Sequence, residues 1–231
     1  MKKLRILSGG AAQGLVEQLR PAFEAETGCT IDGTFGAVGA MRARLLGGDP
    51  ADLVILTRAL IDGLARDGHV AGATAADLGT VETAIAVRRG EALPPVGDAA
   101  ALRAALLAAD AIHFPDPEQA TAGIHFAKVL KDLGIQGDVA VRLHTAPNGA
   151  TAMKALAASK ARRPIGCTQA TEILSTPGIV LVAPLPPGCA LATVYTAAIG
   201  ARAEAAAEAA RLLALLTEAS GREGRWRLGF I

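Results

Sequence analysis

The chain has 231 residues, of which 23 are Lys or Arg and 22 are Asp or Glu, giving a formal net charge of +1. Because the charge is balanced and aromatic residues make up only 3%, the sequence lacks the basic field and the stacking platforms of a nucleic-acid-binding protein. Hydrophobic residues reach 51% without an uninterrupted apolar run of about 20, which excludes membrane insertion and predicts a globular protein.

The first third of the chain alternates strands and helices through turns of small residues. The stretch "ILSGGAAQGL" reads as strand Ile6–Leu7, a glycine turn and a helix that Gly28 ends. Two further strands are expected at 29–35 and 51–56, with a helix over 40–46 between them. The last strand is a continuous apolar run, as in a buried parallel sheet, and leads into Thr57 and Arg58.

The middle and the end of the chain repeat this alternation. The expected strands are 83–87, 111–114, 139–143, 165–168 and 193–199. The expected helices are 99–109, 124–133, 150–158 and the alanine-rich segment 203–219. Glycine turns between a strand and a helix leave backbone N–H groups free at the positive end of the helix dipole, which favours an anion. The pattern therefore predicts a small anionic ligand.

Two features bear on location and redox state. Met1-Lys2-Lys3-Leu4-Arg5 resembles the basic start of a signal peptide, but the apolar segment behind it ends within a few residues at Ser8. A cytoplasmic location is expected for the sequence as given, with a periplasmic location as the alternative if the N-terminus was processed or replaced. Cys29, Cys167 and Cys189 are widely spaced and odd in number, so buried thiols are expected, without a disulfide, metal site or cofactor.

Several motifs, in this order, resemble the molybdate-binding family of periplasmic solute receptors, bacterial extracellular solute-binding protein family 11. They are "ILSGGAAQGL", "FGAVGAMRARLLGGDPADLVIL", "FPDPEQATAGIHFAKVLKDLGI", "PIGCTQATEI" and "RWRLGFI". The resemblance implies an α/β fold of the periplasmic-binding-protein type 2, with two lobes, a ligand cleft between them and two hinge crossings. Lobe 1 would hold residues 1–82 and 196–231, and lobe 2 residues 83–195.

The sequence departs from that family where the ligand would bind. Family members use serines in the first and second turns and a tyrosine hydroxyl from the second lobe. Here Ala11 takes the first place, Ala37-Val38-Gly39 the second, and Gln169 stands for the tyrosine. Ser8 lies three residues too early to be the family serine. The departures leave the ligand's identity open between molybdate, another oxyanion and an organic acid, and the sequence identifies no transporter partner.

The residues expected to bind the ligand share a place at strand ends or helix starts. They are Ser8, Gly9, Gly10, Ala11, Val38, Gly39, Arg42, Thr57, Arg58, Thr121 and Gln169. The guanidinium groups favour a carboxylate, because their planar fork matches it. Alternatives stay open: Arg58 could pair with Asp62 on the surface, and Thr57 and Thr121 could simply cap helices.

An enzyme is the alternative function, because aconitate isomerase belongs to a branch that resembles these receptors. Shifting a double bond in a tricarboxylate needs a base, and His144, just before the turn 145–149, is the candidate. His113 and His125 are expected to pack in a strand and a helix. The turn at Ser8–Gly14 lacks the Lys-Ser/Thr and the glycine order of nucleotide-binding loops.

Overall fold

The computed structural model describes residues 2–231 and divides into two compact units. Unit 1 comprises Met1–Val81 and Thr193–Ile231, and unit 2 comprises Glu82–Ala192. The chain thus crosses from one unit to the other twice, within strand β4 (Ala76–Arg88) and at the start of strand β9 (Ala192–Ile199).

Unit 1 is a mixed sheet with helices on both faces. Its parallel strands are β1 (Lys3–Gly9), β2 (Thr30–Gly36) and β3 (Leu53–Thr57). They follow the order β2-β1-β3, then antiparallel β9 and next to it β4. Its helical elements are η1 (Gly10–Ala12), α1 (Gln13–Thr27), α2 (Val38–Leu46), α3 (Arg58–Arg66), η2 (Gly72–Thr74), α9 (Ala206–Thr217), η4 (Ala219–Gly221) and α10 (Arg222–Arg227).

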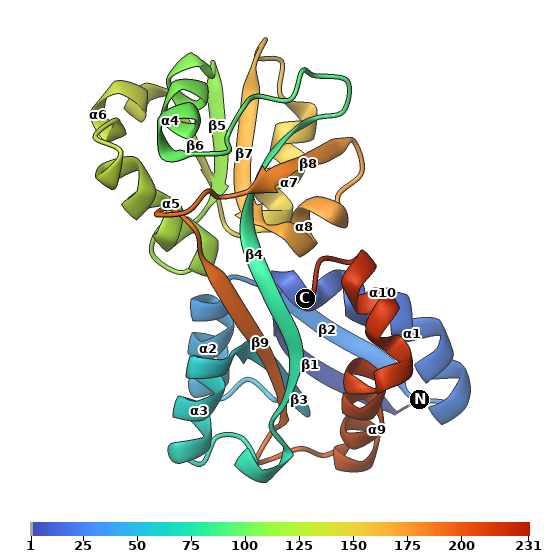
Figure 1. Ribbon diagram of the computed structural model, residues 1–231. Helices are drawn as coiled ribbons and strands as arrows, with labels where there is room; N and C mark the ends of the chain where they lie inside the picture. The colour runs from blue at the N-terminus through green and yellow to red at the C-terminus, as the bar shows by residue number, and fades with distance from the viewer. Residues whose placement is uncertain (1) are drawn as a thin grey trace. The chain divides into compact units, whose positions relative to one another are not determined.

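Helices cover the unit 1 sheet from two sides. Figure 1 shows α1, α9 and α10 on one side and α2 and α3 on the other. Strand β3 is buried along almost its whole length, which confirms the prediction of a strand enclosed on both faces.

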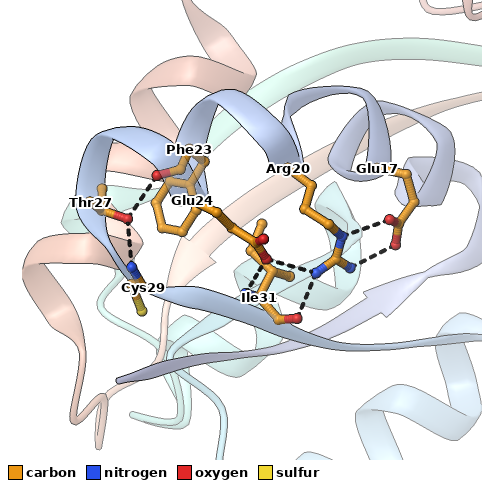
Figure 2. A network of polar contacts seen from close by, with 7 residues as sticks. All are labelled: Glu17, Arg20, Phe23, Glu24, Thr27, Cys29 and Ile31. Carbon is orange, nitrogen blue, oxygen red and sulfur yellow. Dashed lines mark hydrogen bonds and ion pairs between the residues drawn. The ribbon is translucent and has the colours of Figure 1, made fainter. Parts of the chain in front are cut away.

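A polar network ties α1 to the start of β2 (Figure 2). The Arg20 guanidinium donates to Glu17, Glu24 and the backbone oxygen of Ile31, while Glu24 accepts from the Ile31 N–H. The hydrogen bond from Arg20 lowers the pKa of Glu17. Gly28 ends the helix in the left-handed region at φ 66°. These contacts set the direction in which β2 leaves the helix.

Unit 2 repeats the sheet order of unit 1 with different strands. Its strands are β5 (Ala111–Pro115), β6 (Leu143–Ala146), β7 (Pro164–Gln169), β8 (Ile179–Pro184) and the second half of β4. The order is β6-β5-β7-β4, with β8 pairing β4 from the other side. As in unit 1, the first of the three parallel strands lies between the other two. An antiparallel strand and one further strand follow at one side of the sheet.

The helical elements of unit 2 are α4 (Ala99–Ala108), α5 (Thr121–Asp132), α6 (Gln136–Val139), η3 (Ala140–Arg142), α7 (Gly149–Ala158) and α8 (Ala170–Leu174). A buried hydrophobic cluster joins α4, α5 and α6 to one face of the sheet, and Phe114 meets Phe126 edge to face in it. Figure 1 shows α7 and α8 on the other side.

Three sequence-based element predictions were incomplete or wrong. Residues 139–142 are not a strand, and β6 begins only at Leu143: Val139 ends α6, the next three residues form η3, and Arg142 donates to the backbone oxygens of Leu107 and Ala109. Strand β4 begins at Ala76 rather than at residue 83. It includes Gly79 at φ 143°, a conformation that favours glycine. Strand β8 was not predicted.

Candidate functional site

Several helices that follow the parallel strands begin without a side-chain cap. In unit 1 the residues before α2 and α3 are Ala37 and Thr57, and neither side chain bonds a backbone N–H of its helix. The turn Gly9–Ala12 before α1 has no side-chain cap either. In unit 2 the same holds for Ala120 before α5. The first N–H groups of these helices are therefore not satisfied by cap side chains, and an anion would be a suitable partner for them.

Helix α7 differs, because its first turn is satisfied from within the protein. Asn148 caps it by accepting from the Thr151 N–H at 2.9 Å. The buried carboxyl group of Glu172 also accepts from the backbone N–H groups of Gly149 and Ala150 and from the Thr168 hydroxyl at 2.5 Å. Burial raises the pKa of Glu172, and these hydrogen bonds oppose that rise.

Gly149 is the residue that makes room for this carboxyl group. A Cβ atom at position 149 would lie 1.8 Å from Glu172 Oε2 and 2.1 Å from Thr168 Oγ1. Gly123, in the first turn of α5, is equally constrained, since a Cβ there would lie 2.1 Å from the backbone oxygen of Asp116. Both glycines are required by close approach and not by a positive φ.

Unpartnered polar atoms gather at the end of β7. Both amide atoms of Gln169 are buried without a hydrogen-bond partner, as are the hydroxyl oxygens of Thr83 and Thr171. Gln169 and Thr83 are cross-strand neighbours in the β4–β7 pair. Buried polar groups are rarely left unpaired, so these atoms are candidates for hydrogen bonds with a partner from outside the chain.

The structure places the expected site residues in different surroundings. Gly9, Ala11 and Val38 lie at the uncapped turns of unit 1, as do Gly10 and Gly39, whereas Thr121 and Gln169 lie in unit 2. Ser8 is fully buried and donates its hydroxyl proton to the backbone oxygen of Gly9 at 2.9 Å. Arg42 is exposed on α2 and forms no ion pair with any residue from 2 to 231.

Two alternatives from the sequence are resolved by contacts. Arg58 pairs with Asp77 and not with Asp62, and Asp77 also accepts from the Thr196 hydroxyl at 2.6 Å. Thr57 precedes α3 without bonding its N–H groups, while Thr121 is the first residue of α5 and therefore not its cap. Capping thus accounts for neither threonine.

The three candidate histidines lie in a strand pair and in a helix. His144 belongs to β6, which continues to Ala146, so the turn begins two residues later than expected. The exposed ring of His144 stacks on His113 at a centroid distance of 5.0 Å. Burial, together with the neighbouring His144, lowers the pKa of His113 to about 4. His125 Nε2 lies 2.7 Å from the backbone oxygen of Cys189, so that nitrogen carries the proton and donates it.

Sequence reasoning missed several residues at these strand ends. Tyr195, the single tyrosine of the chain, is buried opposite Thr57, and a Cβ at Gly9 would lie 3.2 Å from its ring. Asp77, Thr83 and Glu172 were also missed. The register of β9 against β3 places Tyr195 opposite Thr57, and that of β4 against β7 places Thr83 opposite Gln169. Patterns within a single strand do not reveal such register.

Other features do not suit a small anion. A groove of about 470 Å³ lined mainly by alanines and prolines lies beside α4 and offers few hydrogen-bond donors.

Cys29, Cys167 and Cys189 are buried free thiols. Among residues 2–231, no group of three or more His, Cys, Asp or Glu side chains is arranged to hold a metal. Within the same residues, none of the helices combines the length and the apolar character needed to cross a membrane.

The comparisons with known proteins agree with this architecture. Residues 4–229 match the family described as bacterial extracellular solute-binding protein. The chain belongs to this family. A curated relative, aconitate isomerase from Pseudomonas sp, is 28% identical over 215 residues, covering 91% of this chain and 80% of its own.

Solved structures of the same fold include two receptors for inorganic anions. The periplasmic molybdate-binding protein of Azotobacter vinelandii has a TM-score of 0.80 at 17% identity, covering 99% of this chain and 98% of its own. The sulfate-binding protein SubI from Mycobacterium tuberculosis H37Rv has a TM-score of 0.78 at 16% identity, with coverages of 100% and 86%. The periplasmic-binding-protein fold of type 2, expected from the sequence, is confirmed.

Proposed function

We propose that this protein binds a small anion, an organic carboxylate or an inorganic oxyanion, without a cofactor. The observation that carries the proposal is the set of uncapped helix starts after the parallel strands, at Gly9–Ala12, Ala37, Thr57 and Ala120. Backbone N–H groups at such ends attract negative charge. Family membership and the molybdate- and sulfate-binding structures of the same fold support it.

Most of the expected ligand residues keep their proposed roles. Backbone N–H groups of Gly9, Gly10, Ala11, Val38 and Gly39 would donate to the anion, helped by Thr57, Thr121 and Gln169. Arg58 is held by Asp77, so its charge is already balanced and it would contribute less than a free guanidinium. A micromolar affinity needs about −8 kcal/mol, which several charge-assisted hydrogen bonds of about 1.5–3 kcal/mol each supply after desolvation losses.

Thermal unfolding with a panel of anions tests the proposal. The panel contains molybdate, tungstate, sulfate, citrate and the two aconitate isomers, each against a chloride control. A ligand at 100 times its Kd adds about 2.7 kcal/mol of stability. In a chain of this size that raises the melting temperature by roughly 5–10 °C. If no anion raises it, the proposal is wrong.

Isomerisation of a tricarboxylate is the second candidate function, favoured by the 28% identical aconitate isomerase that covers 91% of this chain. A base would remove a proton from a CH₂ carbon, the double bond would shift, and the proton would return to the other end of the allylic system. The reaction is balanced without a cofactor. His144 is the proposed base, with N–H groups and Arg58 or Arg42 holding carboxylates.

Proton NMR in D₂O separates receptor from enzyme. An isomerase converts cis- into trans-aconitate and exchanges the allylic proton for deuterium, and His144→Ala should reduce both rates at least about 100-fold. His69→Ala, at an exposed position outside the proposed site, is the matched control. Stabilisation by the acid without exchange would leave a receptor as the function.

The family description names extracellular proteins, which supports the periplasmic alternative for location. We therefore propose that the protein acts outside the cytoplasm and delivers its ligand to a transporter. Fractionation of the native host with markers for each compartment tests the location. Recovery with cytoplasmic markers alone would contradict it.

A further inference from the structure

Gln169 and Thr83 form a small polar cluster with no internal partners. Gln169 is 2% exposed and Thr83 1%, yet neither amide atom of the glutamine nor the hydroxyl of the threonine makes a hydrogen bond. They face each other across the antiparallel β4–β7 pair, so their side chains share one face of the sheet. The cluster is therefore a local feature of unit 2.

That face is the one covered by α5. Side chains alternate along β7, and Ile165 and Cys167, four and two residues before Gln169, belong to the buried cluster that includes Phe126 of α5. Helix α5 runs back along the sheet from its uncapped start at Ala120 and Thr121. Gln169 is thus the last residue of β7, and its side chain is on the face of the sheet that the start of α5 covers.

An unpartnered glutamine amide destabilises the folded protein, because it loses its hydrogen bonds to water and gains none. Methionine would fill a similar volume with no polar group to satisfy. Both amide atoms are unpaired, so the amide is equally unsatisfied in either of its two flipped orientations. Such a group is explained when a ligand completes its bonds.

We propose that Gln169, assisted by Thr83, recognises a hydroxyl group of the ligand, so that the protein prefers hydroxy acids to acids that lack the hydroxyl. This inference rests on the proposed anion binding and specifies its ligand class. Carboxylates and fully ionised oxyanions only accept hydrogen bonds, so they pair with the amide nitrogen but leave the amide oxygen unpaired. A hydroxyl beside a carboxylate donates to that oxygen.

Matched ligand pairs and matched variants test the preference. Calorimetry would compare citrate with tricarballylate, and malate with succinate, where each second acid lacks only the hydroxyl. The wild-type protein should bind the hydroxy acid of at least one pair about tenfold or more tightly. In Gln169→Met that ratio should fall to within about threefold, while Gln136→Met, at an exposed position of α6, leaves it unchanged.

The same variant supplies a readout that a purely structural glutamine would not give. Because the substitution removes an unsatisfied group, the empty Gln169→Met protein should melt about 2–4 °C higher than the wild type even as it loses the hydroxyl preference. Thr83→Val provides a second test in case Gln169→Met does not fold, and it should also reduce the ratio.

The outcomes separate this inference from the proposed function. Equal binding of both acids in every pair would overturn the hydroxyl preference and leave anion binding intact. That result is expected if the Thr83 hydroxyl rotates to bond the Gln169 amide. A preference that survives both Gln169→Met and Thr83→Val would also overturn it. Failure of all these acids and of the inorganic anions to bind would overturn the inference together with the proposed function.

Discussion

At the scale of single residues, Gly149 shows how a close approach fixes an amino acid. The Glu172 carboxyl group and the Thr168 hydroxyl occupy the space that any Cβ at position 149 would need. We expect Gly149→Ala to lower the free energy of unfolding by about 1–3 kcal/mol, because an overpacked buried site must shift. Urea unfolding followed by circular dichroism measures it.

A second glycine of unit 2 serves as the control for this prediction. Gly137 lies in α6 with open space around its Cα, so Gly137→Ala should be neutral or stabilise by up to about 1 kcal/mol. Equal losses in the two variants would mean that the crowding at Gly149 has no energetic weight.

His113 is a residue whose burial predicts a pH dependence. Its folded pKa of about 4 lies below the ordinary value of 6.5, because burial and the neighbouring His144 disfavour the charged ring. The unfolded chain therefore binds more protons between these values, so stability is present above about pH 6.5 and is lost as the pH falls toward 4. By about pH 4.5 the loss should be about 2 kcal/mol.

Comparison with a variant isolates this contribution. His113→Leu should show a loss of stability between about pH 7 and pH 4.5 that is smaller by about 2 kcal/mol than in the wild type, measured from urea midpoints. His69→Gln, at an exposed position, is the control. Parallel pH profiles for the wild type and His113→Leu would contradict the assignment.

At the scale of elements, helix α2 offers a way to replace the proposed ligand by a side chain. Ala37 has the extended backbone of an N-cap residue, with φ −61° and ψ 138°, but no group to bond the helix. Ala37→Asp should stabilise the empty protein by about 1 kcal/mol and weaken anion binding at least about tenfold, because a carboxylate then occupies the N–H groups. Thermal shift and calorimetry measure both effects.

A capped helix of unit 2 provides the opposite control. Asp98 caps α4 through the Ala101 N–H at 2.8 Å. Asp98→Ala should cost about 1 kcal/mol of stability and leave the anion affinity unchanged. Unaltered anion binding in Ala37→Asp would remove the α2 turn from the site.

The C-terminal segment after α10 is an element that packs through one side chain. Phe230 is 3% exposed, and Thr80 and Ile231 exchange two backbone hydrogen bonds of 2.8 Å. Phe230→Ala should cost about 3–4 kcal/mol, as expected for a truncated buried aromatic ring. Trp226→Ala, at a position 66% exposed, should change stability by less than about 0.5 kcal/mol, and similar losses in both would contradict the packing.

Most elements were predictable because strands and helices carry local patterns. The apolar run 51–56 and the spacing of Leu15, Leu19 and Phe23 give β3 and α1 directly. The strand predicted over 139–143 was mostly wrong, because Arg142 donates hydrogen bonds to the backbone oxygens of Leu107 and Ala109 at the end of α4. The Arg58–Asp77 pair, the Gln169–Thr83 cluster and Tyr195 could not be foreseen, since each depends on strand pairing between distant segments.

At the scale of the whole molecule, the two units share one order of strands but differ in which helix N-termini are capped by side chains. The orders β2-β1-β3-β9-β4 and β6-β5-β7-β4-β8 place equivalent helices after equivalent strands. Helix α2, after the second strand of unit 1, begins uncapped, whereas its counterpart α7 in unit 2 is satisfied by Asn148 and Glu172. Unit 2 therefore offers fewer free donors, and Gln169 is its distinctive polar group.

The balance of charge over the whole chain predicts a weak response of anion binding to salt. With 23 basic and 22 acidic side chains there is no strong long-range field, and Asp77 neutralises Arg58 near the proposed donors. Raising NaCl from about 0.05 to about 0.5 M should weaken wild-type affinity by less than about threefold. In Asp77→Asn the freed guanidinium should bind the anion more tightly at low salt and lose more of that affinity as salt rises. A wild-type loss of tenfold or more would show that unbalanced cationic side chains rather than neutral N–H groups dominate binding. An Asp77→Asn profile that matches the wild type would show that Arg58 does not contribute to anion binding.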